Sequence, residues 1–351
     1  MAVNKRHSNI SVFVPHMGCP HTCSFCNQRT ISSTAAAPAP EETDKMLKEA
    51  FSRIPAERHS DTEIAFFGGS FTAIDREYMA TLLSAAAKYV FCEGGFGGIR
   101  ISTRPDCIDE EILILLKSYG VTSIELGAQS MSDRVLELNE RGHTADDVRK
   151  SARLIKEHGF ETGLQMMVGL YGSTVEDEML TMREIADCSP DTVRIYPTVI
   201  LDGTHLGELY RKGLYKTFSF EECVSLCGDM LCYFHNRNIR VIRLGLHAED
   251  GVENNAIGGF YHPAFAQLVR SELFMRAILR ALKNNSPEKL EIAVCGKNTD
   301  CAVGHKKSNR KRLTEMGIPF SFSVDNSLTE DEISINKEVY NVFKITGDAR
   351  L

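Results

Sequence analysis

Three cysteines in one short segment, Cys19, Cys23 and Cys26, are the residues of this chain best suited to chemistry. Their C-x3-C-x2-C spacing offers three thiolates from neighbouring positions. A 4Fe-4S cluster has four irons and is usually held by four cysteines, so three ligands leave one iron open to a donor from outside the protein. The spacing therefore predicts a reactive iron-sulfur centre and not only an electron carrier.

Zinc is the main alternative for this segment, since His16 or His21 offers a fourth ligand, and unliganded thiols are another. The sequence has no second C-x2-C pair to complete an all-cysteine zinc site. Its 11 cysteines are an odd number spread over 351 residues, unlike the framework of a small secreted protein. We therefore expect reduced thiols, which cluster assembly needs.

The composition, 43% hydrophobic and 25% charged, is typical of a protein with a large core. Residues 1–9 are polar, and the apolar stretch 10–15 that follows is too short for a signal peptide or a membrane span. We therefore expect no membrane segment and a cytoplasmic location.

Short β-rich runs alternate with longer runs of helical periodicity along most of the chain. The expected strands are 10–15, 63–67, 98–103, 123–126, 162–168, 192–197 and 240–246. The expected helices are 41–54, 76–91, 109–118, 145–158, 174–187, 219–236 and 264–283. Because strands that alternate with helices form βαβ units, the pattern predicts an α/β fold with a parallel sheet.

Polar or glycine-rich motifs follow several of these strands, as the cysteine segment follows the first. They are GGSFT at 68–72, STRPD at 102–106, ELGAQS at 125–130 and QMMVG at 165–169. The carboxyl ends of parallel strands meet at one edge of a sheet, where ligands collect. We therefore expect all of these motifs to contribute to one site.

The motifs also resemble a known family. The segment 12–27, together with STRPD at 102–106, IELGAQS at 124–130, RGHT at 141–144 and VRIYPTVILDGT at 193–204, is similar to the radical S-adenosylmethionine (SAM) part of the Elongator catalytic subunit and its bacterial relatives. A more distant likeness is to oxygen-independent coproporphyrinogen oxidase. The resemblance extends over roughly residues 8–280 and implies a partial (β/α)6 radical-SAM barrel that binds a 4Fe-4S cluster and SAM.

The resemblance also assigns roles to individual residues. The cluster ligands would be Cys19, Cys23 and Cys26. The SAM contacts would be Gly68, Gly69, Ser70, Ser102, Arg104, Glu125, Gln129, Arg141, Gln165 and Arg194. A buried carboxylate at Glu125 needs a partner, such as Arg104 or the SAM hydroxyls. His143 is a candidate proton donor, and capping of the next helix is its alternative role.

The sequence pattern that follows the barrel predicts a small C-terminal α+β domain. We place the barrel at residues 1–285 and this domain at 286–351, with a turn at 284–287. The net charge of the chain is -7, yet the segment 297–312 has six basic residues and one acidic residue. Its glycine, basic helix and strand are similar to a KH RNA-binding module without the second glycine of the loop. A solvated basic helix is the more common alternative.

From these observations we expect an enzyme that cleaves SAM reductively at the cluster to a 5'-deoxyadenosyl radical, with reduced flavodoxin or ferredoxin as electron donor. By resemblance its substrate would be a tRNA base, and we expect no acetyltransferase domain. The basic residues that would contact tRNA or another RNA are Lys306, Lys307, Arg310, Lys311 and Arg312. Two alternatives stay open: a radical SAM enzyme acting on a small molecule or tetrapyrrole, and a non-catalytic iron-sulfur RNA-binding protein.

Overall fold

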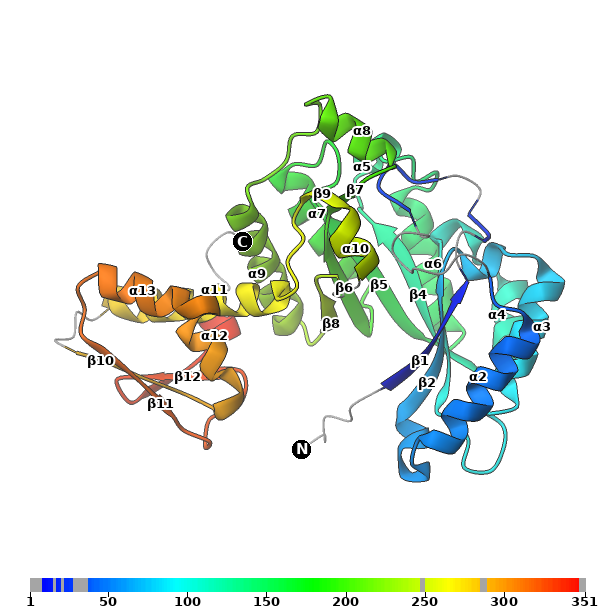
Figure 1. Ribbon diagram of the computed structural model, residues 1–351, viewed down its shortest axis with the longest axis horizontal. Helices are drawn as coiled ribbons and strands as arrows, with labels where there is room; N and C mark the ends of the chain where they lie inside the picture. The colour runs from blue at the N-terminus through cyan, green and yellow to red at the C-terminus, as the bar shows by residue number, and fades with distance from the viewer. Residues whose placement is uncertain are drawn as a thin grey trace. The chain divides into compact units, whose positions relative to one another are not determined.

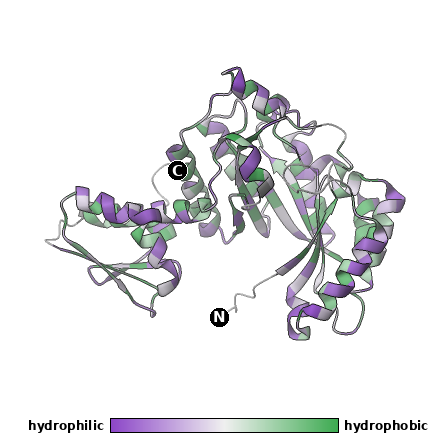
Figure 2. Cartoon of the chain, in the orientation of Figure 1, coloured by the Kyte–Doolittle hydropathy of each residue, from purple (hydrophilic) through white to green (hydrophobic). Residues whose placement is uncertain are grey.

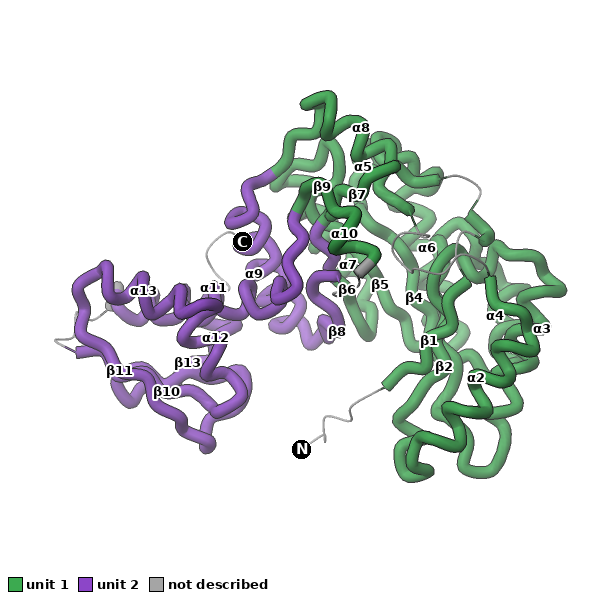
Figure 3. The backbone as a smooth tube through the Cα atoms, viewed as in Figure 1, with its two compact units in different colours: residues 1–194, 198–217, 248–259 green, residues 195–197, 218–247, 260–351 purple. Residues whose placement is uncertain are grey.

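The computed structural model describes residues 8–14, 17–19, 22–27, 37–246, 250–284 and 289–346. The chain divides into two compact units (Figure 3). Unit 1 comprises residues 1–194, 198–217 and 248–259, and unit 2 comprises residues 195–197, 218–247 and 260–351. Residues 285–288, where the sequence places the domain boundary, lie outside the described residues, and that boundary stays a prediction.

Seven strands form one curled sheet with the order β1-β2-β3-β4-β5-β6-β8 (Figure 1). Its strands are β1 (Ser8–Val14), β2 (Thr62–Gly68), β3 (Gly98–Thr103), β4 (Val121–Gln129), β5 (Glu161–Val168), β6 (Thr192–Pro197) and β8 (Arg240–Leu244). The pairings from β1 to β5 are all parallel. The sheet confirms the seven strands and the partial barrel that the sequence predicts.

Helices connect the parallel strands of unit 1. They are α2 (Pro40–Arg53), α3 (Arg76–Ala87), α4 (Glu110–Ser118), α5 (Asp133–Leu138), α6 (Ala145–Glu157) and α7 (Val175–Asp187). Several begin at an N-cap whose side chain accepts a backbone N–H: Thr144 caps α6 and Thr174 caps α7. These N-caps fix where α6 and α7 begin. The segments between them and the carboxyl ends of the preceding strands are where the site residues lie.

Short elements complete unit 1. They are the 3-10 turns at Ala56–Asp61, Phe71–Ala73 and Pro105–Cys107, the strands β7 (Val199–Leu201) and β9 (Ala256–Gly259), and the helices α8 (His205–Arg211) and α10 (Asp250–Asn255). Strands β7 and β9 pair antiparallel as a separate two-stranded sheet. The sequence pattern did not predict these two strands.

The two faces of the large sheet differ because side chains alternate along each strand. One face carries fully buried apolar side chains such as Phe66, Ile101 and Leu126, and helix α6 packs against β4 and β5. The strands accordingly show both hydrophobic and hydrophilic colours along their length in Figure 2. The opposite face, toward the inside of the half-barrel, carries charged residues such as Arg100 and Glu125.

Unit 2 combines three mutually packed helices with a four-stranded sheet. The helices are α9 (Phe220–Asn236), α11 (Phe265–Asn284) and α14 (Val342–Thr346). The sheet has the order β11-β10-β12-β13, with β10 (Leu290–Val294), β11 (Phe320–Val324), β12 (Glu332–Ile335) and β13 (Glu338–Asn341). Between β10 and β11 lie α12 (Thr299–Val303), α13 (Ser308–Glu315) and two 3-10 turns, Gly296–Asn298 and His305–Lys307. None of the described helices is long and apolar enough to span a bilayer.

Candidate active site at the carboxyl edge of the half-barrel

The cysteine segment follows β1 and packs directly on the glycine turn after β2. A Cβ atom at Gly18 would overlap the carbonyl oxygen of Ser70, and one at Gly69 would overlap that of Met17. Gly18 also has a φ of +74°, a left-handed conformation that favours glycine. The Ser70 amide donates to the Met17 carbonyl oxygen over 3.2 Å. The cysteine segment and the glycine turn are therefore in backbone contact.

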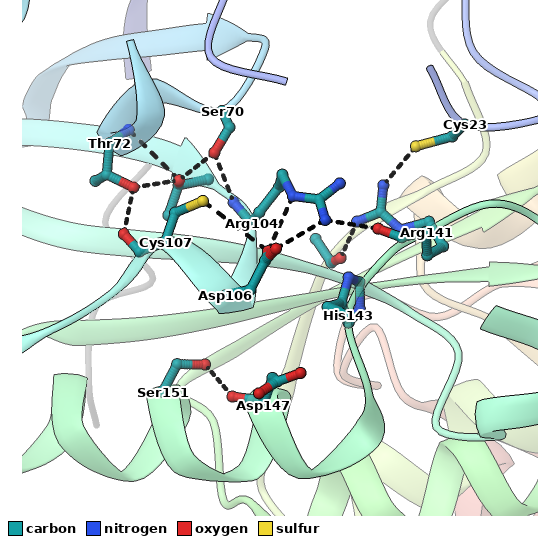
Figure 4. Close-up of polar contacts among 12 residues, drawn as sticks. Cys23, Ser70, Thr72, Arg104, Asp106, Cys107, Arg141, His143, Asp147 and Ser151 are labelled. Carbon is teal, nitrogen blue, oxygen red and sulfur yellow. Dashed lines mark hydrogen bonds and ion pairs between the residues drawn. The ribbon is translucent and has the colours of Figure 1, made fainter. Parts of the chain in front are cut away.

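Arg141 lies beside one of the three sulfur atoms. Its Nη1 donates to Cys23 Sγ over 3.0 Å and its Nη2 donates to the Gly127 carbonyl oxygen over 2.6 Å (Figure 4). Cys23 is buried, while Cys19 and Cys26 are half-buried. Burial raises the pKa of Cys19, and the charges of Arg104 and Arg141 act in the opposite direction. The two arginine charges therefore offset only part of the effect of burial, and the pKa of Cys19 stays above its ordinary value.

Arg104 forms two parallel hydrogen bonds with a carboxylate of the protein itself, that of Asp106. Its Nε and Nη2 donate to the two oxygens of Asp106 over 2.9 Å each, and Nη2 also donates to the Arg141 carbonyl oxygen over 2.6 Å. Burial raises the pKa of Asp106, but the ion pair with Arg104 outweighs it and leaves the pKa below its ordinary value. Asp106 thereby fixes the direction of the Arg104 guanidinium.

Hydroxyl groups join the turn after β2 to the end of β3. Thr103 Oγ1 lies 2.8 Å from Ser70 Oγ and 2.6 Å from Thr72 Oγ1, and the Arg104 amide donates to Ser70 Oγ over 3.2 Å. These contacts place the SAM-binding candidates Ser70 and Arg104 next to each other, as the sequence motifs suggest. Ser102, one residue earlier, instead donates to Glu125 Oε2 over 3.4 Å.

Among the residues that the structure describes, four buried side chains around the cysteine segment each have one polar atom without a hydrogen-bond partner. These atoms are Arg104 Nη1, Gln129 Oε1, Arg141 Nε and His143 Nδ1. We call the four residues the edge set. Each of the four residues is at most 6% exposed. Buried polar groups are normally paired, and an unpaired one costs roughly 1–3 kcal/mol. A polar ligand with carboxylate, amino and hydroxyl groups, as SAM has, would supply the missing partners.

His143 contacts the sheet through one ring nitrogen. Its Nε2 lies 3.2 Å from the Ala128 carbonyl oxygen, which only accepts, so Nε2 carries the proton. Burial, followed by the charge of Arg141, lowers the pKa of His143 to about 4. The neutral ring then offers Nδ1 as an acceptor. Because Thr144 caps α6, the capping role for His143 is wrong, and its role in proton transfer stays a prediction.

Glu125 has partners that the sequence did not name. Its Oε1 accepts from Arg194 Nη2 over 2.7 Å and from Arg100 Nη1 over 3.2 Å. Arg104 is committed to Asp106 and does not pair with Glu125. Arg194 also lies over the Phe67 ring, 5.4 Å from its centroid. Glu125 and Arg194, both predicted to contact SAM, therefore form an ion pair with each other inside the half-barrel.

Arg100 is the residue of this region that sequence reasoning missed. Besides Glu125, it contacts Glu63 Oε2 over 2.8 Å through Nε and Glu161 Oε1 over 3.2 Å through Nη2. Burial lowers its pKa, but the three carboxylates outweigh it and keep the pKa above its ordinary value. We call Glu63, Arg100, Glu125, Glu161 and Arg194 the inner-face network. The signal in the sequence is one such charged residue within each of five successive strands, β2 to β6.

The remaining predicted contacts are at the same edge. Gly68 ends β2, and Gln165 pairs with Gly127 between β5 and β4 in a half-buried position. All of the predicted site residues in the described part of the chain thus lie in unit 1. His16 and His21, the zinc alternatives, lie outside the described residues.

The donor chemistry of the cysteine segment fits an iron-sulfur cluster. No disulfide joins any of the eleven cysteines, all of which lie in the described residues. Within the residues that the structure describes, no three His, Cys, Asp or Glu side chains come together as a metal site. The support for a cluster is therefore the spacing of the three thiols, their position at the carboxyl edge and the arginine that faces Cys23. Cys223, Cys227 and Cys232 are buried on α9.

This geometry defines a class: a parallel half-barrel enzyme with a thiol-rich segment after its first strand and a polar cofactor site at its carboxyl edge. Comparison with known families agrees with that description. Residues 13–185 match the model of the radical SAM superfamily, and residues 190–274 match that of the radical SAM C-terminal domain. The chain belongs to the radical SAM superfamily, whose members are enzymes that use a 4Fe-4S cluster and SAM.

Two curated relatives and one solved structure illustrate the similarity. The chain is 34% identical over 184 residues to a tRNA uridine(34) acetyltransferase of Methanocaldococcus jannaschii, covering 47% of this chain and 34% of that protein. It is 30% identical over 232 residues to an uncharacterized protein of the same organism, covering 61% of this chain and 68% of that protein. An Elp3 of Methanocaldococcus infernus has a similar fold, with a TM-score of 0.59 at 21% identity, over 80% of this chain and 63% of that one. The chain thus spans about a third of the length of the first of these relatives.

Proposed function

We propose that this chain holds a 4Fe-4S cluster through Cys19, Cys23 and Cys26, binds SAM across the edge set and acts on a base of tRNA. One observation carries the proposal: the edge set leaves four buried polar atoms without partners directly beside the cysteine segment. A polar ligand bound there would supply hydrogen-bond partners that no described residue provides and would offset their desolvation.

Different residues of the chain have different roles in the proposed reaction. A cluster held by the three cysteines would accept an electron from the reduced donor and supply it for the reductive cleavage of SAM. Arg104 and Arg141 present guanidinium N–H groups suited to the SAM carboxylate, and Asp106 holds Arg104 in place. Gly69 lets the turn after β2 approach the backbone of Met17, and Gly68 is the glycine of this turn whose backbone would approach the ligand. Neutral His143 offers Nδ1 as an acceptor for a substrate or SAM proton. The half-barrel excludes water from the site.

Reductive SAM cleavage is the direct test of this assignment. The full chain, reconstituted anaerobically with iron and sulfide and then reduced with dithionite, should convert SAM to 5'-deoxyadenosine. The variant Cys23→Ala should reduce this product to background. Cys92→Ala, the same substitution at an exposed cysteine, should keep it unchanged. A reconstituted protein without iron, or with iron but without 5'-deoxyadenosine, would overturn the assignment.

The tRNA part of the proposal rests on the relatives and on a basic loop in unit 2. Lys306 and Lys307 are exposed, lie between α12 and α13 and both adopt left-handed conformations, with φ of 50° and 64°. In the described part of the chain neither forms an ion pair. Left-handed lysines are strained, and strained residues cluster at functional sites. Helix α13, mainly hydrophilic in Figure 2, adds Arg310, Lys311 and Arg312 on its exposed surface.

Loss of these charges should weaken RNA binding. We expect the double variant Lys306→Glu, Lys307→Glu to bind tRNA at least tenfold more weakly at low salt, and the salt dependence of binding to become shallower. The matched control is Lys45→Glu, Lys48→Glu, two exposed lysines on α2 in unit 1. If the parent protein binds no RNA at low salt, the result favours the alternative, a radical SAM enzyme that acts on a small molecule or tetrapyrrole.

We further propose a cytoplasmic location with a reduced flavodoxin or ferredoxin as electron donor. Eleven cysteines outside any disulfide fit a reducing compartment.

A further inference from the structure

Asn139, directly after α5, is fully buried and contacts the cysteine segment twice. The Ser24 amide donates to the Asn139 carbonyl oxygen over 3.2 Å, and Ser24 Oγ donates to Asn139 Oδ1 over 2.9 Å. Both residues are 0% exposed. Asn139 therefore binds both the backbone and the side chain of the residue that follows Cys23.

The same side chain is anchored on its other side. Asn139 Nδ2 donates to the carbonyl oxygens of Val135, over 2.8 Å, and Tyr171, over 3.0 Å, and Oδ1 accepts from the Tyr171 amide over 3.3 Å. Both ends of the amide are thus satisfied within unit 1. The anchor Tyr171 lies in the loop after β5, which buried Glu178 holds by accepting from the Gly169 amide over 2.7 Å. The Asn139 side chain thus bonds the cysteine segment and the loop after β5 at the same time.

Further contacts fix the rest of the segment around Ser24. The Cys26 amide donates to the Cys23 carbonyl oxygen over 3.0 Å, which closes a turn between the two cysteines. The Ser24 carbonyl oxygen accepts from the Leu206 amide over 2.7 Å at the start of α8. Phe25 packs against the apolar cluster that contains Leu206 and Tyr215. The turn is therefore held from α5 on one side and from α8 on the other.

We propose that Asn139 is a positioning residue that forms the Cys23–Cys26 half of the metal site before any cluster arrives. Arg141, two residues further on, contacts Cys23 Sγ over 3.0 Å, so the segment 139–141 clamps both the backbone and the sulfur. Preorganised ligands lose less conformational entropy when they bind a metal. The metal part of this inference rests on the proposed function, whereas the preformed turn does not.

Thiol reactivity of the metal-free full chain tests the clamp without any cluster. Timed alkylation with iodoacetamide, read cysteine by cysteine by mass spectrometry, should show Cys23 reacting about tenfold faster in Asn139→Ala than in the parent, because local opening exposes the turn. Cys227, fully buried in unit 2, should react at the parental rate. Ser24→Ala removes only the hydroxyl contact and should give a smaller acceleration.

A matched variant separates the clamp from a general loss of stability. Asn298→Ala also removes a buried amide, one that donates to the Glu330 carbonyl oxygen in unit 2, and should leave Cys23 reactivity unchanged. After reconstitution, Asn139→Ala should release iron to a chelator faster than the parent and change the response of the reduced cluster's EPR signal to SAM. Equal alkylation of Cys23 in Asn139→Ala and parent, or equal acceleration of Cys23 and Cys227, would overturn the proposal. If the parent takes up no iron, the proposed function fails, while the alkylation result still decides the clamp.

Discussion

The inner-face network and the edge set lie in the same half-barrel, and both are built from buried polar side chains. In the inner-face network each arginine faces carboxylates at 2.7–3.2 Å. In the edge set each residue has a buried atom without a partner. Burial alone therefore does not separate the two groups, whereas the completeness of their hydrogen bonding among the described residues does. The ligand role that we propose belongs to the incompletely bonded group.

The largest expected effect is on stability, from breaking the inner-face network at its centre. Arg100→Met leaves Glu63 and Glu125 buried with fewer cations nearby, and should lower the free energy of unfolding by roughly 3–5 kcal/mol. Urea denaturation of the metal-free protein measures the change. Arg149→Met, which breaks the more exposed ion pair with Glu184, should cost about 1 kcal/mol or less. Equal losses in the two variants would remove the basis for treating the network as structural.

The pH dependence of stability tests the edge set through His143. Its folded pKa of about 4 lies below the ordinary value of 6.5, so the unfolded chain binds more protons between these values. The contribution of His143 to stability is therefore fully present above pH 6.5 and is lost as the pH falls toward 4. The loss should amount to about 3 kcal/mol. His143→Asn should flatten this part of the curve in urea denaturation of the metal-free protein. A parental slope in the variant would show that His143 is not held neutral.

The smallest effect on stability, and the sharpest contrast with Arg100, is expected at Gln129. Its Oε1 is buried without a partner, so Gln129→Met should change the free energy of unfolding by less than about 1 kcal/mol. The affinity of the reconstituted enzyme for SAM should nevertheless fall about tenfold, as measured by calorimetry. Gln267→Met, the same substitution on α11 in unit 2, should change neither quantity. A large loss of stability with unchanged SAM affinity would reverse the assignment of Gln129.

Periodicity and strand order made the architecture predictable. Runs such as 62–68 and 161–168 contain enough β-branched and aromatic residues, between clear helices, to reveal the parallel sheet. Because parallel strands present their carboxyl ends at one edge, the motifs around Ser70 and Arg104 were expected together, and the structure places them together. Arg141, which only the family resemblance assigned to the site, contacts Arg104 through its carbonyl oxygen.

Partners fixed by tertiary contacts were not predictable. Arg100 lies inside a strand and reads as an ordinary charged position until three neighbouring strands bring carboxylates to it. The hairpin between β12 and β13 turns at Asn336 and Lys337, both with positive φ, where the usual sequence signal would be a glycine. Asn139 resembles any residue at the end of a helix until its contact with Ser24 is seen. In each case the decisive partner is remote in sequence.

The backbone contact between Gly69 and Met17 has a consequence for how this enzyme can fail. No side chain separates the turn after β2 from the backbone of residues 17–18, which precede Cys19. A displacement of one segment therefore displaces the other. A larger side chain at Gly69, a residue that is not itself a cluster ligand, would thus displace the cysteine sulfur atoms. Loss of iron in such a protein would trace to crowding and not to a missing ligand.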